Sequence, residues 1–386
     1  MQNFECKLGT RVVFGEGREN EVGKYVAGYS KKVLIHYGGD YLKEYGILDR
    51  ITKSLEENNI EYVIFDGVVP NPRLSLVNEG IKICREQDID FILAVGGGSA
   101  IDSSKAIALG TMYDGDVWDF YTGQATPEKA LKVGVVLTIP GSGSEMSESS
   151  IITNEKENLK CGIDTEVIVP EFAILNPEMC YTIPPYLLSC GIADTLTHLF
   201  ERYFTPTKNV VITDYLIEGA MKALLEIGPK LKEDPKNYDY CAEFMWIATI
   251  AHNGTMDVGR ASDWGSHRIE HEISALYDIT HGGGMAIIYP AWMKYVKNQD
   301  IDRFNQLATR VFGVDNTDKE EAADEGIKKV EEFFRTLGLK TTLTEADIPL
   351  DRFEEMAEKA VGEAGFVGRF KRLEVKDIIE ILNIAK

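Results

Sequence analysis

Apolar positions follow two alternating patterns in the first half of the chain. Short runs rich in β-branched residues are typical of strands, and amphipathic stretches of helical period separate the first three of them. Strands that alternate with helices of this length predict crossover units and a parallel sheet. The predicted strands are 33–37, 62–65, 91–95, 133–139 and 172–175, and the predicted helices between them are 41–57 and 72–86.

The pattern changes after the Pro-Pro pair at 184–185. From there to the C-terminus the periodicity is almost entirely helical, with few strand candidates. We therefore expect an α/β domain over 1–184 and an all-helical domain over 185–386. The predicted helices of the second domain include 187–204, 212–225, 240–252, 264–277 and 317–335.

Composition narrows the class of protein. The chain has 386 residues, 44% hydrophobic and 27% charged, which is ordinary for a globular protein. Its net charge of −21 argues against nucleic-acid binding, which needs a basic surface. No apolar run approaches the roughly 20 residues of a membrane-spanning helix, and no signal peptide is visible. Six scattered cysteines indicate reduced thiols, so we expect a cytoplasmic protein without nucleic-acid or membrane partners.

A glycine-rich loop follows the third predicted strand. The strand at 91–95 leads into Gly-Gly-Gly-Ser at 96–99, and a helix carrying Asp102 and Lys105 begins there. Glycine allows close backbone approach and a helix start presents free N–H groups, so the loop predicts a phosphate site. An ordinary tight strand–helix turn is the alternative. The usual GxGxxG fingerprint is absent, and a second glycine-serine loop lies at 141–145.

The histidines form a second constellation. Only six are present, and five of them lie beyond residue 197. Asp194 and His198 are four residues apart, as are His267 and His271, so each pair projects from one helix face. His281 follows, directly before three glycines. A carboxylate with several imidazoles suits a divalent transition metal such as iron or zinc.

A purely structural interpretation of these residues competes with the metal site. Pairs at helical spacing also arise by chance on helix surfaces. The remaining two histidines, His36 and His252, have no partner in the sequence, and we expect structural roles for both.

These motifs together resemble the iron-containing, or group III, alcohol dehydrogenase family. Within it the sequence is similar to the butanol dehydrogenase and broad-specificity aldehyde reductase branch. The matching stretches run from near residue 10 to beyond 290, so the resemblance covers most of the chain. They are 13–17, 70–72, 96–102, 143–145, 191–194 with His198, 267–271 and 281–284.

The resemblance implies a dehydroquinate synthase-like fold, with an α/β N-terminal nucleotide-binding domain, an all-α C-terminal metal-binding domain and the site in the cleft between them. It also implies one divalent metal, iron or alternatively zinc, and a homodimer that pairs the stretch 11–14 across its interface. His271 matches a position near the substrate and is our candidate catalytic proton relay. The implied metal ligands are Asp194, His198, His267 and His281.

Further positions match cofactor contacts of the family. The pyrophosphate loop corresponds to Gly97, Gly98, Ser99 and Asp102. The other implied cofactor positions are Asn71, Thr138, Ser142, Lys160 and Thr182.

Cofactor choice depends on the residues after the first predicted strand, which read Gly38-Gly39-Asp40. In the family a small glycine run is typical of NADP and an aspartate of NAD. Gly38 and Gly39 would leave room for a 2′-phosphate, so we expect a preference for NADP(H), with NAD(H) as the alternative. Asp40 would weaken phosphate binding unless it only caps the helix that begins near Tyr41.

The expected activity is hydride transfer between NADP(H) and a small primary alcohol or aldehyde such as butanol or butanal, with the metal as Lewis acid. A glycerol dehydrogenase-like polyol oxidoreductase is the nearest alternative. A dehydroquinate synthase-type lyase would need several basic residues, and 252–281 offers only Arg260 and Arg268. A non-catalytic binding protein would be expected to have lost a metal ligand.

Overall fold

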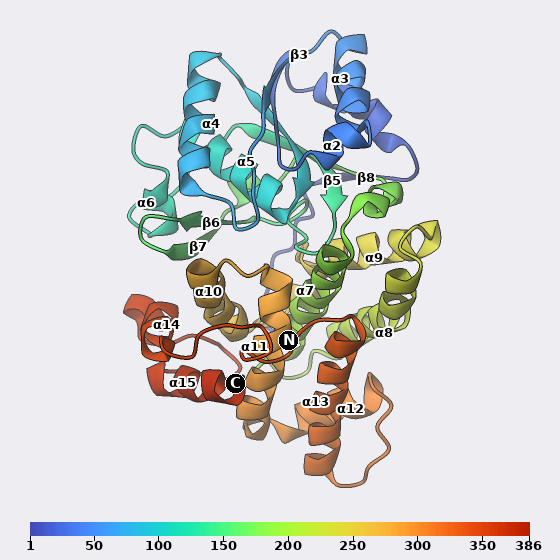
Figure 1. Ribbon diagram of the computed structural model, residues 1–386, viewed down its shortest axis with the longest axis vertical. Helices are drawn as coiled ribbons and strands as arrows, with labels where there is room; N and C mark the ends of the chain where they lie inside the picture. The colour runs from blue at the N-terminus through green and yellow to red at the C-terminus, as the bar shows by residue number, and fades with distance from the viewer. The chain divides into compact units, whose positions relative to one another are not determined.

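A six-stranded parallel sheet forms the centre of the first half of the chain (Figure 1). Its order is β1-β8-β5-β4-β2-β3. All five strands predicted from the sequence are confirmed, and β1, at the edge, is added to them. The strands are β1 (Arg11–Phe14), β2 (Lys32–Tyr37), β3 (Glu61–Phe65), β4 (Phe91–Gly97), β5 (Lys132–Ile139) and β8 (Phe172–Leu175).

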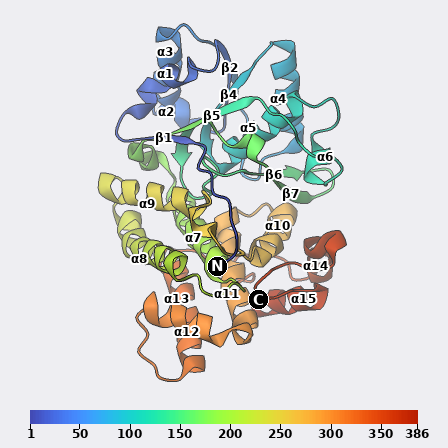
Figure 2. The same cartoon turned by 180° about the vertical axis from the view of Figure 1, so that it is seen from behind.

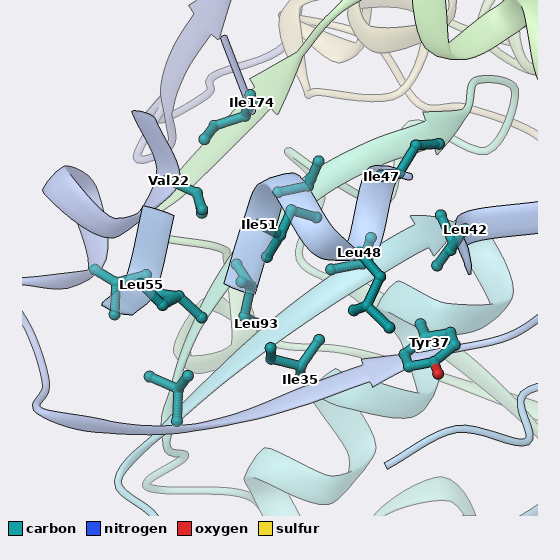
Figure 3. Close-up of a cluster of buried hydrophobic side chains, with 14 of the residues drawn as sticks. Val22, Ile35, Tyr37, Leu42, Ile47, Leu48, Ile51, Leu55, Leu93 and Ile174 are labelled. Atoms are coloured by element: carbon teal, nitrogen blue, oxygen red, sulfur yellow. The ribbon is translucent and has the colours of Figure 1, made fainter. Parts of the chain in front are cut away.

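Helices cover both faces of this sheet, which explains why its central strands are continuous apolar runs. Figure 3 shows one face, where Ile51 and Leu55 of α3 pack toward Ile35 of β2 and Leu93 of β4. On the other face α5 packs against β4, and α4 packs against α5. The helices of this half are α1 (Val22–Val26), α2 (Tyr41–Glu44), α3 (Ile47–Glu57), α4 (Leu74–Glu86), α5 (Gly98–Thr111) and α6 (Trp118–Tyr121).

The strand order contains a topological switch point. The chain passes from β2 outward to β3 and then returns to place β4 on the other side of β2. The connections therefore diverge at the carboxyl ends of β2 and β4, where open parallel sheets bind their ligands. Gly38 directly follows β2 and Gly97 ends β4, so two of the predicted cofactor loops flank this point.

Two features of the α/β half differ from the sequence prediction. The single helix predicted over 41–57 is broken into α2 and α3, because Gly46 lies between them with a left-handed φ of 64°. An antiparallel hairpin of β6 (Ser149–Asn154) and β7 (Leu159–Asp164) was not predicted. About half of the residues in these strands are polar, and the apolar ones do not alternate regularly with them.

The second half is entirely helical, as predicted. Its longest inner helices, α7 and α11, pack against each other, and α10 packs against α11. No helix is long and apolar enough to cross a membrane. The helices are α7 (Pro185–Tyr203), α8 (Val211–Glu233), α9 (Tyr238–Ala251), α10 (Gly265–Tyr277), α11 (His281–Val296), α12 (Ile301–Arg310), α13 (Lys319–Thr336), α14 (Phe353–Val361) and α15 (Val375–Ile384).

The computed structural model describes residues 1–386, and its internal contacts divide the chain into two units (Figure 2). The α/β unit contains Lys7–Ile183 and Lys236–Met245. The helical unit contains Met1–Cys6, Pro184–Pro235 and Trp246–Lys386. The prediction of a single boundary at 184/185 missed two exceptions. The N-terminus belongs to the helical unit, and the start of α9 belongs to the α/β unit.

The core of the sheet provides a test of the fold. Leu93 is fully buried in β4, whereas Ile64 in the outer strand β3 is 46% exposed. We expect Leu93→Ala to lower the free energy of unfolding of the α/β unit by about 2–5 kcal/mol, because it leaves a cavity. Ile64→Ala is the matched control and should cost much less. Thermal unfolding followed by circular dichroism compares the two, and equal midpoints would contradict the assigned core.

Candidate metal centre and nucleotide loops

Three helices of the helical unit bring four metal-donor groups together. Asp194 and His198 lie one turn apart on α7, His267 lies on α10, and His281 is the first residue of α11. Asp194 Oδ1 is 3.6 Å from His198 Nε2 and 3.6 Å from His281 Nε2. Donor atoms of Asp194, His267 and His281 all lie within 4.8 Å of one another. The four residues that the sequence suggested as ligands therefore form one cluster.

The glycines after His281 explain how α11 reaches this cluster. A Cβ atom on Gly282 would lie 2.0 Å from the backbone oxygen of Cys190 on α7. A Cβ atom on Gly284 would lie 2.4 Å from Oε1 of Glu270 on α10. Only glycine allows so close an approach, and this approach places His281 beside Asp194.

Two buried glutamates contact the clustered histidines, and the sequence analysis singled out neither. Glu201 Oε1 lies 2.7 Å from His267 Nδ1, and Glu270 Oε2 pairs with His281 Nδ1. Burial raises the pKa of Glu201 to about 7. In a chain with 62 acidic residues a single glutamate gives no signal. The only available hint was spacing, because each glutamate follows a predicted ligand by three residues.

His271 lies at the border of the cluster. It is buried on α10, and its ring centroid is 5.6 Å from that of His281. Donor atoms of Glu270, His271 and His281 also lie within 4.8 Å of one another, which is a second possible metal grouping. The grouping around Asp194 is the better one, because the Glu270 carboxylate already accepts hydrogen bonds from Ser274 and His281.

Aromatic rings surround the cluster on one side. The His198 and His267 rings stack with centroids 5.1 Å apart, and Trp264 lies 5.0 Å from His267. Trp264 adopts a left-handed φ of 67°, a strained conformation for a bulky residue. His252, which we expected to be structural, has its ring 4.7 Å from that of His198. Burial lowers the pKa of His252 well below its usual value, so it is neutral.

The remaining histidine lies in the α/β unit and has a structural role. His36 is buried in β2, where its ring nitrogens contact the Phe65 backbone oxygen at 2.9 Å and Ser103 Oγ at 2.8 Å. Burial lowers the pKa of His36 to about 4.

The predicted nucleotide loops gather at the carboxyl ends of three adjacent strands in the α/β unit. Residues 38–40 follow β2, 97–99 join β4 to α5, and Thr138 and Ser142 lie at the end of β5. The N-cap of α5, Gly97, makes no side-chain capping bond. The first turn of α5 therefore presents amide groups suited to an anion.

Tight packing also accounts for the glycines of this loop. A Cβ atom on Gly97 would lie 2.8 Å from the Cβ atom of Ile139. A Cβ atom on Gly98 would lie 2.5 Å from Ser142 Oγ. These contacts let the two loops touch and account for the glycines by packing alone, so the phosphate site stays a prediction.

Asp102 and Lys105 hold a neighbouring segment of the protein. Asp102 accepts from Ser144 Oγ at 2.5 Å and from the Ile151 amide at 3.0 Å. The fully buried Lys105 ammonium donates to the backbone oxygens of residues 144, 147 and 149 at 2.7, 2.9 and 2.8 Å. Burial raises the pKa of Asp102 and lowers that of Lys105 to about 8. Both Asp102 oxygens are thus engaged within the protein.

The other predicted cofactor positions are partly brought together. Lys160 Nζ on β7 donates to Asn71 Oδ1 at 3.0 Å, and both residues are buried. Thr138 Oγ1 pairs with the Tyr41 hydroxyl at 2.7 Å. Thr182 donates to the Met179 backbone oxygen at 2.9 Å, a local bond that does not link it to the other positions.

Two family models together match most of the chain. The model of the iron-containing alcohol dehydrogenase family matches 9–177, and that of the Fe-containing alcohol dehydrogenase family C-terminal domain matches 189–385. The chain is 41% identical over 385 residues to a probable NADH-dependent butanol dehydrogenase 1 of Bacillus subtilis, covering 99% of both chains. It is 33% identical over 373 residues to the NADPH-dependent aldehyde reductase YqhD of Escherichia coli, covering 94% of this chain and 96% of that one.

Solved structures resemble the chain over its whole length. The crystal structure of an NADH-dependent butanol dehydrogenase A from Thermotoga maritima superposes with a TM-score of 0.97 at 37% sequence identity. The match covers 100% of this chain and 99% of that one.

The buried ammonium group of Lys105 provides a test of the loop beside the glycine turn. In Lys105→Met three backbone oxygens lose their donor, which costs about 1–3 kcal/mol for buried groups. We expect amides of 144–151 to exchange hydrogen roughly 10- to 100-fold faster, measured by mass spectrometry. Lys82→Met is the control, because the Lys82 side chain is 72% exposed. Unchanged exchange in Lys105→Met would show that the loop is held by other contacts.

Proposed function

The chain belongs to the butanol dehydrogenase and aldehyde reductase branch of the iron-containing alcohol dehydrogenase family, and we propose that it interconverts small primary alcohols and aldehydes, such as butanol and butanal, with a nicotinamide cofactor and a divalent metal. Membership establishes an alcohol dehydrogenase or aldehyde reductase. The observation that carries the metal dependence is the convergence of Asp194, His198, His267 and His281 from three helices.

The donor set fits a divalent transition metal. One carboxylate and three imidazoles are ligands that iron and zinc both accept, and we propose iron with zinc as the alternative. Asp194, His198 and His267 are each less than 10% exposed, so a charged group held there is shielded from water. The bound metal would supply a Lewis acid that polarises the substrate oxygen.

His271 is our candidate for moving the proton that accompanies hydride transfer. It lies beside the ligand His281 without belonging to the favoured donor set. An imidazole titrates near neutral pH, so it can both donate and accept a proton at physiological pH. We therefore propose that His271 acts as the catalytic acid and base.

We propose that the nicotinamide cofactor binds at the switch point of the sheet. The loop Gly97–Ser99 and the open N-terminus of α5 would bind its pyrophosphate, because amide donors and the helix dipole favour an anion there. Asp102 and the buried Lys105 would support this loop by holding in place the neighbouring segment that contains Ser144.

The preference for NADP(H) expected from the sequence depended on room at Gly38 and Gly39. The structure provides another reason for a glycine at each of these two positions. A Cβ atom on Gly38 would lie 2.1 Å from the Val68 backbone oxygen, and Gly39 has a left-handed φ of 85°. Asp40 is exposed at the N-cap of α2 but makes no capping bond, so the capping interpretation finds no support.

These observations favour an interaction of Asp40 with the cofactor. An acidic residue after the strand at a switch point binds the ribose 2′-hydroxyl and repels a 2′-phosphate. We therefore propose NAD(H) as the preferred cofactor in place of NADP(H). Relatives named for NADH and for NADPH both occur, so the family alone does not decide the choice.

We also propose a homodimer. Strand β1 forms the edge of the sheet and pairs on one side only, with β8. The free edge could extend the sheet into a second copy of the chain, as the sequence led us to expect.

The metal assignment predicts how single substitutions separate metal from turnover. Replacing any one of the four proposed ligands by alanine should remove bound metal, and NADH-dependent reduction of butanal should be lost with it. His271→Ala should retain the metal and lower kcat roughly 10²- to 10⁴-fold, as expected for loss of an acid–base group. Elemental analysis and steady-state kinetics on the same samples measure both quantities.

Two outcomes would contradict this assignment. Full metal content in His267→Ala would remove that residue from the ligand set. Loss of metal in His271→Ala would favour the alternative grouping with Glu270 and His281. A wild-type protein that holds metal but reduces neither butanal nor other aldehydes would contradict the proposed substrate class.

Cofactor choice gives a further prediction. The wild-type protein should have a higher kcat/KM with NADH than with NADPH. In Asp40→Ser the value for NADPH should rise by roughly tenfold or more, equivalent to removing about 1.4 kcal/mol of repulsion. The value for NADH should fall, since a ribose contact is lost. A wild-type protein that prefers NADPH would restore the expectation drawn from the glycine pair.

A further inference from the structure

We propose that Glu201 and Glu270 are positioning residues that fix the tautomer and orientation of His267 and His281, so that both imidazoles present Nε2 to the metal. The inference rests on the proposed function in one respect, namely that these histidines are metal ligands. It goes beyond that function because neither glutamate belongs to the favoured donor set around Asp194.

Glu201 holds His267 and the start of α10. Its side chain is fully buried on α7, and its Oε1 accepts from His267 Nδ1 at 2.7 Å and from Ser266 Oγ. Its Oε2 accepts from the Trp264 amide at 2.8 Å. The ionised carboxylate can only accept, so in that state the shared proton belongs to Nδ1. Nε2 of His267 therefore carries the lone pair that a metal needs.

Glu270 holds His281 in the same way. It is fully buried on α10, where its Oε1 accepts from Ser274 Oγ and its Oε2 accepts from His281 Nδ1. The opposite nitrogen, His281 Nε2, lies 3.6 Å from Asp194 Oδ1. The missing Cβ of Gly284 leaves the space that the Glu270 carboxylate occupies.

The two glutamates occupy equivalent positions relative to the proposed ligands. Glu201 comes three residues after His198 on α7 and orients the ligand on α10, His267. Glu270 comes three residues after His267 on α10 and orients the ligand on α11. A spacing of three places each carboxylate on the same helix face as the preceding histidine. Helix α7 thus contributes ligands and the carboxylate that orients the ligand on α10. Helix α10 contributes a ligand and the carboxylate that orients the ligand on α11.

A purely structural role for the glutamates is the competing explanation, because Glu201 also binds the backbone at the start of α10. The two explanations differ in what they predict for metal affinity. Loss of a carboxylate that orients a ligating histidine weakens metal binding roughly 10- to 100-fold. A structural glutamate would lower the melting temperature without changing the affinity of the folded protein.

The test is a Zn²⁺ titration of the full chain after removal of metal, in competition with a chromophoric chelator. Glu201→Gln and Glu270→Gln should bind Zn²⁺ roughly 10- to 100-fold more weakly than the wild type. Glu218→Gln is the matched control, because Glu218 is equally buried but contacts Tyr203 and Gln306. It should bind as the wild type does. In Co²⁺-loaded samples the visible absorption bands should shift in the two test variants only.

Glu201→Asp and Glu270→Asp keep the charge but withdraw the carboxylate from Nδ1. We expect them to bind Zn²⁺ more weakly as well, which separates orientation from net charge. Wild-type affinity and spectra in folded variants would overturn the proposal and leave the proposed function intact. Absence of Zn²⁺ binding in the wild type would instead contradict the metal site itself.

Two further outcomes count against the proposal. Loss of binding in Glu270→Gln as complete as in His281→Ala would make Glu270 a ligand. If neither variant of Glu201 folds, as judged by circular dichroism, its role is structural and the proposal fails for that residue.

Discussion

The helical unit depends on the burial of one carboxylate, Asp194, among three imidazoles. Removing such groups from water is unfavourable unless each finds a partner of suitable charge or hydrogen-bonding capacity. Glu201 and Glu270 satisfy two of the imidazoles, yet both add negative charge to the same interior. Asp194, Glu201 and Glu270 are each at most 7% exposed, and the buried Arg202 guanidinium offsets part of the negative charge beside Glu201. We propose a divalent cation as the further partner, because one carboxylate and three imidazoles form a donor set that suits such a metal.

Packing elsewhere in the helical unit positions the residues of this cluster. The glycines at 282 and 284 bring α11 against α7 and against Glu270, where any side chain would collide. The strained backbone of Trp264 places its indole against His267 and lets its own amide bond to Glu201. Strain of this kind persists only where the surrounding contacts over-determine it. Here those contacts include two metal-donor helices and the carboxylate that joins them.

Sequence patterns predicted the parts of the molecule that depend on local periodicity. The five predicted strands, the helical second half and the pairing of Asp194 with His198 all follow from spacing along one element. Features that depend on contacts between elements could not be predicted. Only the spacing of three from His198 marks Glu201 among so many acidic residues, and no pattern indicates that the His252 ring lies against that of His198. The sequence likewise could not reveal that a Cβ atom on Gly38 would collide with the backbone of Val68.

The two units differ in the charged groups that they bring together, and each unit does so with its own residues. In the helical unit buried carboxylates gather around imidazoles, and from this donor set we propose a bound cation. In the α/β unit the glycine loop leads into the amide end of α5, where we propose that an anion binds, and the buried ammonium of Lys105 holds the neighbouring segment. Asp40 is the exception, an exposed carboxylate at the same edge of the sheet. A negative charge there does not help to bind a pyrophosphate, which is why we propose that Asp40 discriminates between cofactors that differ by one phosphate group.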